Sequence, residues 1–186
     1  MIEVEVKLKI NSVEDVISKL KELGFSEAEM LRETDTYFDN KEGAIRHSDR
    51  ALRIRETYNY NSDNSCCQIN FKDKKYDNKS MSRPEFETEV NDAESMIKII
   101  NGLGFFPVEP KVIKKRQILK SSSISACVDT VEGLGNFLEL EIITDSEQDR
   151  ETELKKIESV ISALGYGMAD TTTTSYLSAL QGLSDH

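Results

Sequence analysis

The chain has 186 residues, of which 38% are hydrophobic and 31% are charged, and its formal net charge at pH 7 is −10. This length suits a single domain, residues 1–186, with enough apolar side chains to bury a core. The acidic balance argues against nucleic-acid binding, which needs a positive footprint. No apolar run approaches the roughly 20 residues of a membrane span, and no charged-then-apolar leader opens the chain. We therefore expect a cytoplasmic protein that does not contact a membrane.

The first stretch of the chain alternates charged and apolar residues with the period of a β-strand. Glu3, Glu5 and Lys7 fall on one face, and the residues between them are apolar. A single strand of this kind indicates only a sheet that is buried on one face. The same acidic alternation, however, returns at residues 85–87 and 139–141, and basic residues lie between these segments.

The opening strand belongs to a unit that occurs three times in the chain. Each copy combines Glu-x-Glu, an amphipathic helix, and a glycine that is followed by an aromatic residue. The spacing of Asn11 and Glu14 predicts a capping box at the start of the first helix. Because glycine commonly stands just after a helix end, we expect one helix to end at each glycine-aromatic pair. These pairs are Gly24-Phe25, Gly104-Phe105 and Gly165-Tyr166.

Further strands are predicted between these units, and a short helix that carries Tyr176 is predicted in the tail. Tight turns join most of the strands, which predicts antiparallel pairing and an α+β chain. Eight such strands can close into a barrel, with the amphipathic helices packed outside it. The alternative is an open sheet whose charged face is solvated, and the pattern alone leaves both open. The additional strands are predicted at residues 35–39, 51–56, 67–72, 112–119, 125–131 and 137–143.

In a barrel covered by helices, the charged faces of the strands point into the lumen. Converging carboxylates repel one another and favour a divalent cation such as Mg²⁺ or Mn²⁺, whereas clustered bases favour a polyanion. A metal-bound polyphosphate would meet both demands. The predicted lumen acids are Glu3, Glu5, Glu85, Glu87, Asp129, Glu139 and Glu141, and the predicted bases are Lys7, Arg53, Arg55, Lys72, Arg83, Lys114 and Arg116.

Seven sequence blocks, all but the last of them charged, follow one another along nearly the whole chain. They are Glu3-x-Glu5-x-Lys7, residues 35–39, Leu52-Arg53-Ile54-Arg55, Phe71-Lys72 with Arg83-x-Glu85-x-Glu87, Lys114-x-Arg116, residues 129–141, and Ser175-Tyr176-Leu177. This order resembles the CYTH domain, which is also called the triphosphate tunnel metalloenzyme family. A single Glu-x-Glu-x-Lys would be a weak match, whereas the full series in register is specific.

The resemblance implies an eight-stranded antiparallel tunnel and a divalent-metal-dependent enzyme that acts on triphosphates, and it makes a homodimer an expectation. It implies that the metals, Mg²⁺ or Mn²⁺, are held by Glu3, Glu5, Asp129, Glu139 and Glu141. It implies that the phosphate chain is bound by Lys7, Arg53, Arg55, Lys72, Arg83, Lys114 and Arg116, with Glu85 and Glu87 on the same face. The catalytic residues by this match are Glu3, Glu5, Lys7 and Arg116.

Within the family, residues 131–135 and 175–177 are most similar to the class IV adenylyl cyclase branch. In that reaction the ribose 3′-oxygen of ATP attacks the α-phosphorus and pyrophosphate leaves. The alternative is a triphosphatase, in which water attacks a terminal phosphorus of tripolyphosphate, thiamine triphosphate or a nucleoside triphosphate. A third hypothesis is a polyphosphate-binding module without turnover. The intact carboxylates argue against the module, because anion capture alone needs only the bases.

Overall fold

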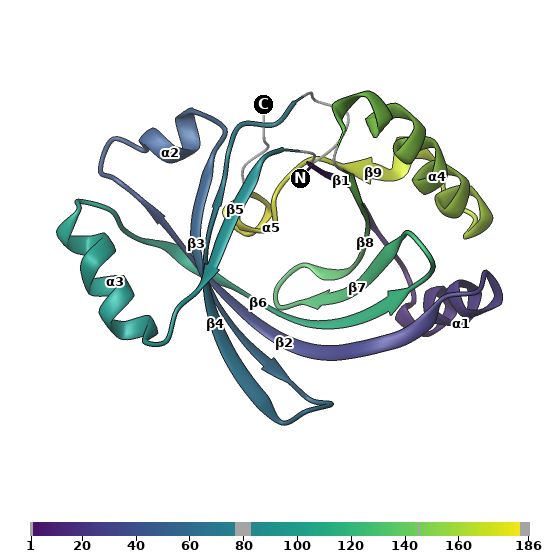
Figure 1. Cartoon of the computed structure of the whole chain (residues 1–186), viewed down its shortest axis with the longest axis horizontal. Helices are drawn as coiled ribbons and strands as arrows, with labels where there is room; N and C mark the ends of the chain where they lie inside the picture. Colours follow the sequence, from purple (N-terminus) through teal and green to yellow (C-terminus); the bar gives the residue numbers. More distant parts are fainter. Residues whose placement is uncertain (1, 77–82, 145, 183–186) are drawn as a thin grey trace.

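The computed structural model describes residues 2–76, 83–144 and 146–182. Nine antiparallel strands form one strongly curved sheet in the order β5-β4-β3-β2-β6-β7-β8-β1-β9 (Figure 1). The strands are β1 (Ile2–Lys9), β2 (Ser26–Asp39), β3 (Ala51–Asn59), β4 (Asn64–Lys72), β5 (Glu85–Glu89), β6 (Phe106–Lys120), β7 (Ser125–Val131), β8 (Gly135–Thr144) and β9 (Thr171–Thr172).

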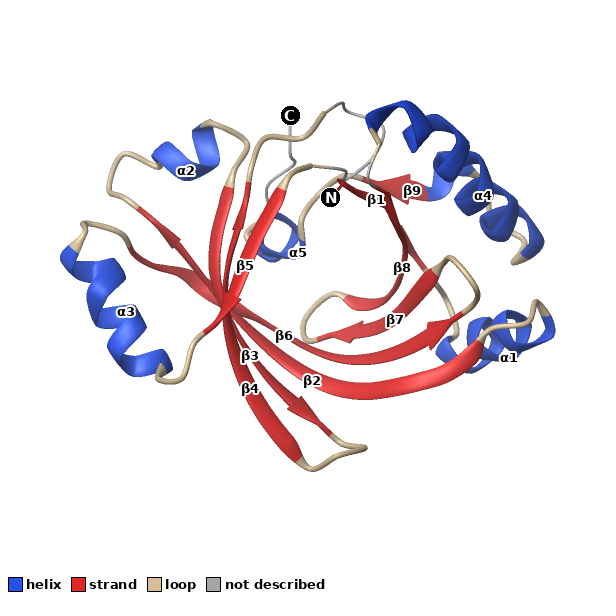
Figure 2. Ribbon diagram, viewed as in Figure 1, coloured by secondary structure: helices blue, strands red, loops and turns tan. Residues whose placement is uncertain are grey.

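Helices α1, α3 and α4 lie on the outside of this sheet, and the short helix α5 lies on its concave side (Figure 2). The helices are α1 (Val13–Glu22), α2 (Ala44–His47), α3 (Ala93–Gly102), α4 (Arg150–Ala163) and α5 (Tyr176–Leu180). Helices α1 and α4 pack on the half of the sheet that contains β1, β7 and β8, whereas α3 packs on β3. The sequence pattern predicts neither α2 nor β9, because both are too short to show a period. No helix in the described part of the chain has the length and apolar character needed to cross a bilayer.

The antiparallel α+β fold with its tunnel-like curvature is confirmed, and two details differ from the expected eight-stranded barrel. The sheet has nine strands, and β5 and β9 at its two edges are not hydrogen-bonded to each other among the described residues. β9 pairs with β1 at Lys7 and Leu8, so it occupies backbone groups that a closing strand would need. Charged side chains nevertheless cross the gap, because Lys72 Nζ on β4 lies 3.7 Å from Glu3 Oε2 on β1.

The main hydrophobic core lies between the outer face of the sheet and helices α1 and α4. Buried residues of β1 and β8, such as Val6 and Leu140, pack with Leu20 of α1 and Ile157 of α4. Each such side chain contributes roughly 1.5–3 kcal/mol of stabilisation relative to leaving it exposed. Because side chains alternate along a strand, burying this face turns the charged face inward. The alternative of a solvated charged face is wrong, since the lumen residue Asp35 is only 1% exposed.

The three predicted helix ends share one geometry. Gly24, Gly104 and Gly165 have φ angles of 88°, 91° and 92°. In each case the N–H of the following aromatic residue donates to a carbonyl five residues earlier, at 3.0 to 3.1 Å. This arrangement is a Schellman-type stop, which needs the left-handed conformation that glycine adopts readily. The start of α1 differs from the expectation: the N-cap is Ser12 rather than Asn11, and its hydroxyl oxygen accepts from the N–H of Asp15 at 3.1 Å.

The strand order is also symmetric. If β1–β4 are matched with β5–β8, the order of these eight strands reads the same from either edge, and β2 and β6 meet at the centre. The first two repeated strand-helix units therefore begin two topologically equivalent halves. The third unit supplies α4, which packs beside α1 on one half only.

Two neighbouring glycines test the helix-end geometry. A Cβ at Gly104 or at Gly102 would meet no atom within 4 Å, but only Gly104 has a positive φ. We expect Gly104→Ala to destabilise the fold by about 1 kcal/mol, because an L-residue is strained in the left-handed region. Gly102→Ala should instead be neutral or stabilising by up to about 1 kcal/mol, since it lies in a helix. Urea unfolding of both variants measures the difference, and equal effects would contradict the assignment.

Candidate functional site

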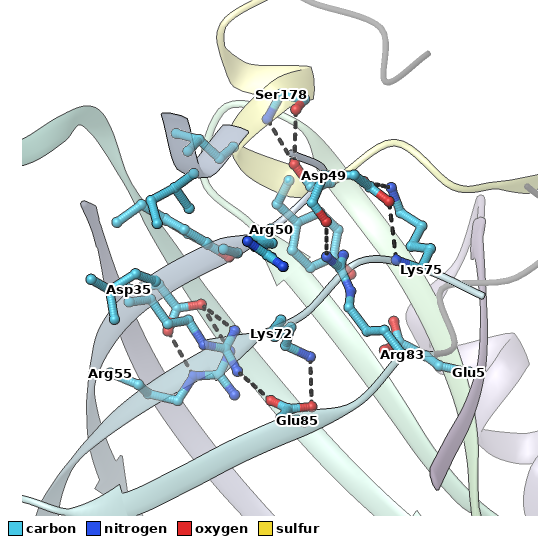
Figure 3. Close-up of a pocket in the computed structure, with 18 of the residues that line it drawn as sticks. Glu5, Asp35, Asp49, Arg50, Arg55, Lys72, Lys75, Arg83, Glu85 and Ser178 are labelled. Atoms are coloured by element: carbon cyan, nitrogen blue, oxygen red, sulfur yellow. Dashed lines mark hydrogen bonds and ion pairs between the residues drawn. The ribbon is translucent and has the colours of Figure 1, made fainter. Parts of the chain in front are cut away.

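The concave face of the sheet encloses a cavity of about 470 Å³ (Figure 3). Every predicted site residue except Asp129 lines this cavity, together with residues of α2 and α5 that were not among the predicted site residues. The predicted residues that line it are Glu3, Glu5, Lys7, Arg53, Arg55, Lys72, Arg83, Glu85, Glu87, Lys114, Arg116, Glu139 and Glu141.

Asp35 on β2 organises three of the bases. Its carboxylate accepts from Arg55 in a bidentate arrangement, with Nε–Oδ1 at 2.6 Å and Nη2–Oδ2 at 2.8 Å. Arg53 Nη1 and Lys114 Nζ also reach Oδ2, at 3.3 and 3.2 Å. Asp35 faces Arg55 directly across β2 and β3, so the strand register brings the pair together.

Glu33 extends this cluster one step along β2. Lys114 lies opposite Glu33 in the register between β2 and β6. Its Nζ atom is 2.8 Å from Glu33 Oε2, and the two form an ion pair that lacks hydrogen-bond geometry. Arg55 is 3.2 Å from the same carboxylate. Burial alone would raise the pKa of Asp35, but Arg55 and Lys114 hold that pKa well below its usual range. The pKa of Glu33 is lowered against burial in the same way, by Lys114 and Arg55. Both acids therefore stay ionised and fix these bases in place.

Neither Glu33 nor Asp35 was among the predicted site residues. The available signal was their spacing on one face of a strand, at the start of the block 35–39. Their pairing with Arg55 and Lys114 depends on strand register, which that spacing does not reveal.

Arg116 on β6 is held by a second bidentate pair. Its Nε and Nη2 atoms donate to Asp129 Oδ1 and Oδ2 at 2.7 and 2.6 Å, and Nη2 also donates to Glu139. Asp129 is fully buried, and Tyr176 donates its hydroxyl proton to Oδ2 at 3.0 Å. Asp129 therefore lies behind Arg116 rather than on the cavity wall, and its assignment as a metal ligand stays a prediction.

Lys72 and Glu85 form a third charged group near the start of β5. Lys72 Nζ lies 2.9 Å from Glu85, and Asn70 and Arg53 reach the other carboxylate oxygen, Asn70 through a hydrogen bond and Arg53 at 3.8 Å. Burial alone would raise the pKa of Glu85, but Lys72 and Arg53 help to lower this pKa to about 2. Glu85 thus serves to hold two bases.

Arg83 is a buried base of a different kind. Its Nη1 donates to the backbone carbonyls of Asp49 and Asp73 at 3.4 and 3.5 Å, and its Nε has no partner among the described residues. No described carboxylate forms an ion pair with it. A buried guanidinium whose hydrogen bonds, among the described residues, are long contacts with carbonyl oxygens favours an anionic ligand.

The carboxylates of β1 and β8, Glu3, Glu5, Glu139 and Glu141, form an acidic group. Glu3 pairs with Lys72 and Glu139 with Arg116, whereas Glu5 and Glu141 have little compensation. Glu5 faces Glu141 directly across the two strands, and neither forms a hydrogen bond or ion pair with the rest of the described chain. Burial raises the pKa of Glu5, and Glu139 and Glu141 raise it further against the opposing effect of Lys72 and Lys7. Burial likewise raises the pKa of Glu3 well above its usual value, with Lys72 opposing and Glu5 adding to the shift.

This acidic group fits a hard divalent cation by its donor type and its unbalanced charge. Carboxylate oxygens are the ligands that Mg²⁺ and Mn²⁺ prefer. In the arrangement that the structure shows, no three acidic, histidine or cysteine side chains of the described residues are gathered closely enough to hold an ion. The observation that supports a cation is therefore the facing pair Glu5 and Glu141, not a completed coordination shell.

The comparisons with known proteins agree with this geometry. Residues 1–176 match the CYTH domain. The chain belongs to the CYTH family. This CYTH chain is 36% identical over 183 residues to a Methanocaldococcus jannaschii protein named "Putative adenylate cyclase MJ0240", and the match covers 98% of this chain and 100% of that protein. The family includes adenylyl cyclase-like proteins and triphosphatases, binds triphosphates and depends on a divalent metal.

Solved structures share the fold of this CYTH chain. The PH1819 protein from Pyrococcus horikoshii OT3 has a TM-score of 0.87 and 28% identity, covering 97% of this chain and 98% of that one. An adenylyl cyclase-named protein from Hippeastrum, described as having a dominant triphosphatase activity, has a TM-score of 0.67 and 16% identity. That match covers 97% of this chain and 95% of the Hippeastrum chain.

The cluster around Asp35 provides a stability test. We expect Asp35→Asn to lower the free energy of unfolding by about 3–5 kcal/mol, because buried bases lose their charged partner. Since the pKa of Asp35 is lowered on folding, its contribution is full above the ordinary carboxyl pKa of about 4 and is lost as the pH falls below it. Urea unfolding at several pH values measures both effects. Glu27→Gln, which breaks an exposed pair with Lys21, is the control and should change nothing measurable. Equal stability of the Asp35 variant and the parent would contradict the buried-pair argument.

Proposed function

We propose that this CYTH chain is a divalent-cation-dependent enzyme that converts ATP to cyclic AMP and pyrophosphate in the charged cavity. The observation that carries the proposal is one buried cavity with bases on one part of its wall and the facing carboxylates Glu5 and Glu141 on another. Support for the cyclase over other triphosphate chemistry comes from the name of the full-length Methanocaldococcus jannaschii relative. It also comes from the similarity of residues 131–135 and 175–177 to the cyclase branch.

In this proposal the acidic group would hold Mg²⁺ or Mn²⁺, and a bound cation would supply positive charge that offsets negative charge on phosphate oxygens. Its ligands would be Glu3, Glu5, Glu139 and Glu141, of which Glu139 also accepts from Arg116 in this structure. Asp129 remains a predicted ligand, although its carboxylate is engaged by Arg116 and Tyr176 in this structure.

The bases of the cavity bind the phosphate chain. Arg53 and Arg83 offer guanidinium forks that can contact phosphate oxygens in pairs, whereas Lys72 and Lys7 act as point charges. Arg55, Lys114 and Arg116 are already fixed by buried acids, so they present charge in one orientation with little reorganisation. The role of Glu87, an exposed acid on β5, stays a prediction.

The alternative is a triphosphatase, and the same cavity can serve it. The two reactions differ in the nucleophile, a ribose 3′-hydroxyl or a water molecule, and in which phosphorus it attacks. The Hippeastrum protein has this fold and is named an adenylyl cyclase, yet it is described as having a dominant triphosphatase activity. The fold therefore does not decide between the two reactions. A polyphosphate-binding module is the third candidate. Cytoplasmic location and homodimer formation also stay predictions.

The metal site can be tested without activity. Burial raises the pKa of Glu5 in the folded protein, so an ionised Glu5 carboxylate opposes folding. The free energy of unfolding therefore falls as the pH rises from the ordinary carboxyl pKa toward the raised pKa of folded Glu5. We therefore expect Glu5→Gln to be more stable than the parent at pH 7 in EDTA. It should also lose most of the rise in melting temperature that Mg²⁺ or Mn²⁺ gives the parent.

Scanning fluorimetry with and without the metal measures both effects for Glu5→Gln. Glu29→Gln, at an exposed acid of β2, is the matched control and should keep the parent response. A Glu5 variant that is destabilised and keeps the full metal response would place the cation elsewhere.

A product assay tests the activity itself. We expect the parent, supplied with Mg²⁺ or Mn²⁺ and ATP, to release cyclic AMP and pyrophosphate in equal amounts, and Glu141→Ala to lose turnover while it keeps its unfolding curve. Orthophosphate release from ATP or tripolyphosphate would favour the triphosphatase instead. Tight tripolyphosphate binding with no product would favour the module. Turnover by Glu141→Ala at the parent rate would contradict the metal assignment.

A further inference from the structure

The short helix α5 reaches the cavity from the C-terminal end of the described chain. Side chains anchor it on two sides: Arg46 Nη1 of α2 donates to Gln181 Oε1, and Gln181 Nε2 donates to the carbonyl of Glu109, both at 2.7 Å. Leu180 packs in a small apolar cluster with residues of β6, β7 and β8. These contacts fix α5 on the concave side of the sheet, where Tyr176 becomes part of the cavity wall.

The ring of Tyr176 contacts two bases of the cavity. Lys7 Nζ lies 4.5 Å from the ring centroid and Lys114 Nζ lies 5.9 Å from it. Phe137 packs edge-on against the same ring at 5.1 Å and limits its movement. A buried cation over an aromatic face is attracted by the ring, so Tyr176 restrains the position of the Lys7 ammonium group.

The hydroxyl of Tyr176 acts on a third base through an acid. It donates to Asp129 Oδ2 at 3.0 Å, and the same carboxylate accepts both bidentate bonds from Arg116. Asp129 is fully buried and does not line the cavity. Its Oδ2 atom thus accepts both from Arg116 and from the tyrosine hydroxyl, and its Oδ1 atom accepts from Arg116 alone. Removing the hydroxyl would free one constraint on the plane to which the Arg116 fork is bound.

We propose that Tyr176 is a positioning residue that holds Arg116, through Asp129, and Lys7, through its ring, in place to bind the triphosphate. The proposal rests on the proposed function, because that function assigns Lys7 and Arg116 to the phosphate chain. The C-terminal segment thereby contributes to substrate affinity without itself touching the phosphates. This role differs from simple packing of α5, because it predicts a change in affinity in a fully folded protein.

Tyr176→Phe tests the hydroxyl while keeping the ring. We expect its KM for the triphosphate that the parent turns over to rise at least ten-fold, with kcat changed less than three-fold, because the lost interaction acts on binding. Its urea unfolding curve should stay close to that of the parent. A purely structural role would lower the active fraction, and hence apparent kcat, at unchanged KM. That result, or parent values of both constants, would overturn the proposal. Tyr166→Phe, in the outer core beside α4, is the matched control and should leave KM unchanged.

A double-mutant cycle tests the route through Asp129. In an Asp129→Asn background, adding Tyr176→Phe should change KM less than two-fold, because the carboxylate that transmits the effect is gone. If the KM of the double variant rises by the product of the two single-variant increases, the hydroxyl acts by another route, and the proposal is overturned.

Calorimetric binding of tripolyphosphate separates this proposal from the proposed function. If the parent binds tripolyphosphate but turns over neither it nor ATP, the enzyme assignment fails and the positioning role can still be measured. In that case Tyr176→Phe should raise the dissociation constant for tripolyphosphate at least ten-fold relative to the parent and to Tyr166→Phe. An unchanged dissociation constant would overturn the positioning role even if the parent is an active enzyme.

Discussion

The pairing of buried charges across neighbouring strands is the constraint on which the rest of this molecule depends. Ionised side chains are costly to remove from water, and they persist inside a protein only when partners and hydrogen bonds replace the lost hydration. Asp35 and Asp129 supply this replacement for the bases of the cavity wall, each through a bidentate arginine. The curvature of the sheet matters for the same reason, since it brings Lys72 of β4 to Glu3 of β1. The helices stabilise that curvature by covering the apolar outer face.

The acidic and basic parts of the cavity are compensated to different degrees. Most bases have a buried acid beside them, whereas Glu5 and Glu141 face each other and form no ion pair with a base among the described residues. The cavity therefore presents most of its bases in fixed positions and also has a place where positive charge is lacking. A triphosphate that carries its own divalent cation complements both parts. This complementarity belongs equally to a cyclase and to a triphosphatase, so the identity of the nucleophile depends on what binds beside the phosphates.

Much of this arrangement could be predicted from the sequence. The two-residue period separates the lumen face from the core face at Glu3, Glu5 and Lys7, and the glycine-aromatic pairs locate the helix ends. The roles of Asp35 and Tyr176 could not be predicted, because each depends on a partner brought close by register or by tertiary packing. The full length of β2 could not be predicted from the residue pattern either. Its first four residues are exposed, so no apolar alternation marks them as a strand. Whether the sheet closes into a barrel depends likewise on β9, and a strand of two residues is too short to show a period.

The symmetric strand order has a further consequence for the origin of the cavity. β2 and β6 are counterparts in the two equivalent halves, yet they are also direct neighbours, and Glu33 of one faces Lys114 of the other. If the halves are aligned on Gly24 and Gly104, Lys114 is the counterpart of Thr34, so in two identical copies of the first half Glu33 would face a threonine. The ion pair between Glu33 and Lys114 therefore depends on a difference between the side chains of the two halves. The path of the backbone repeats, but the charges along the central seam do not.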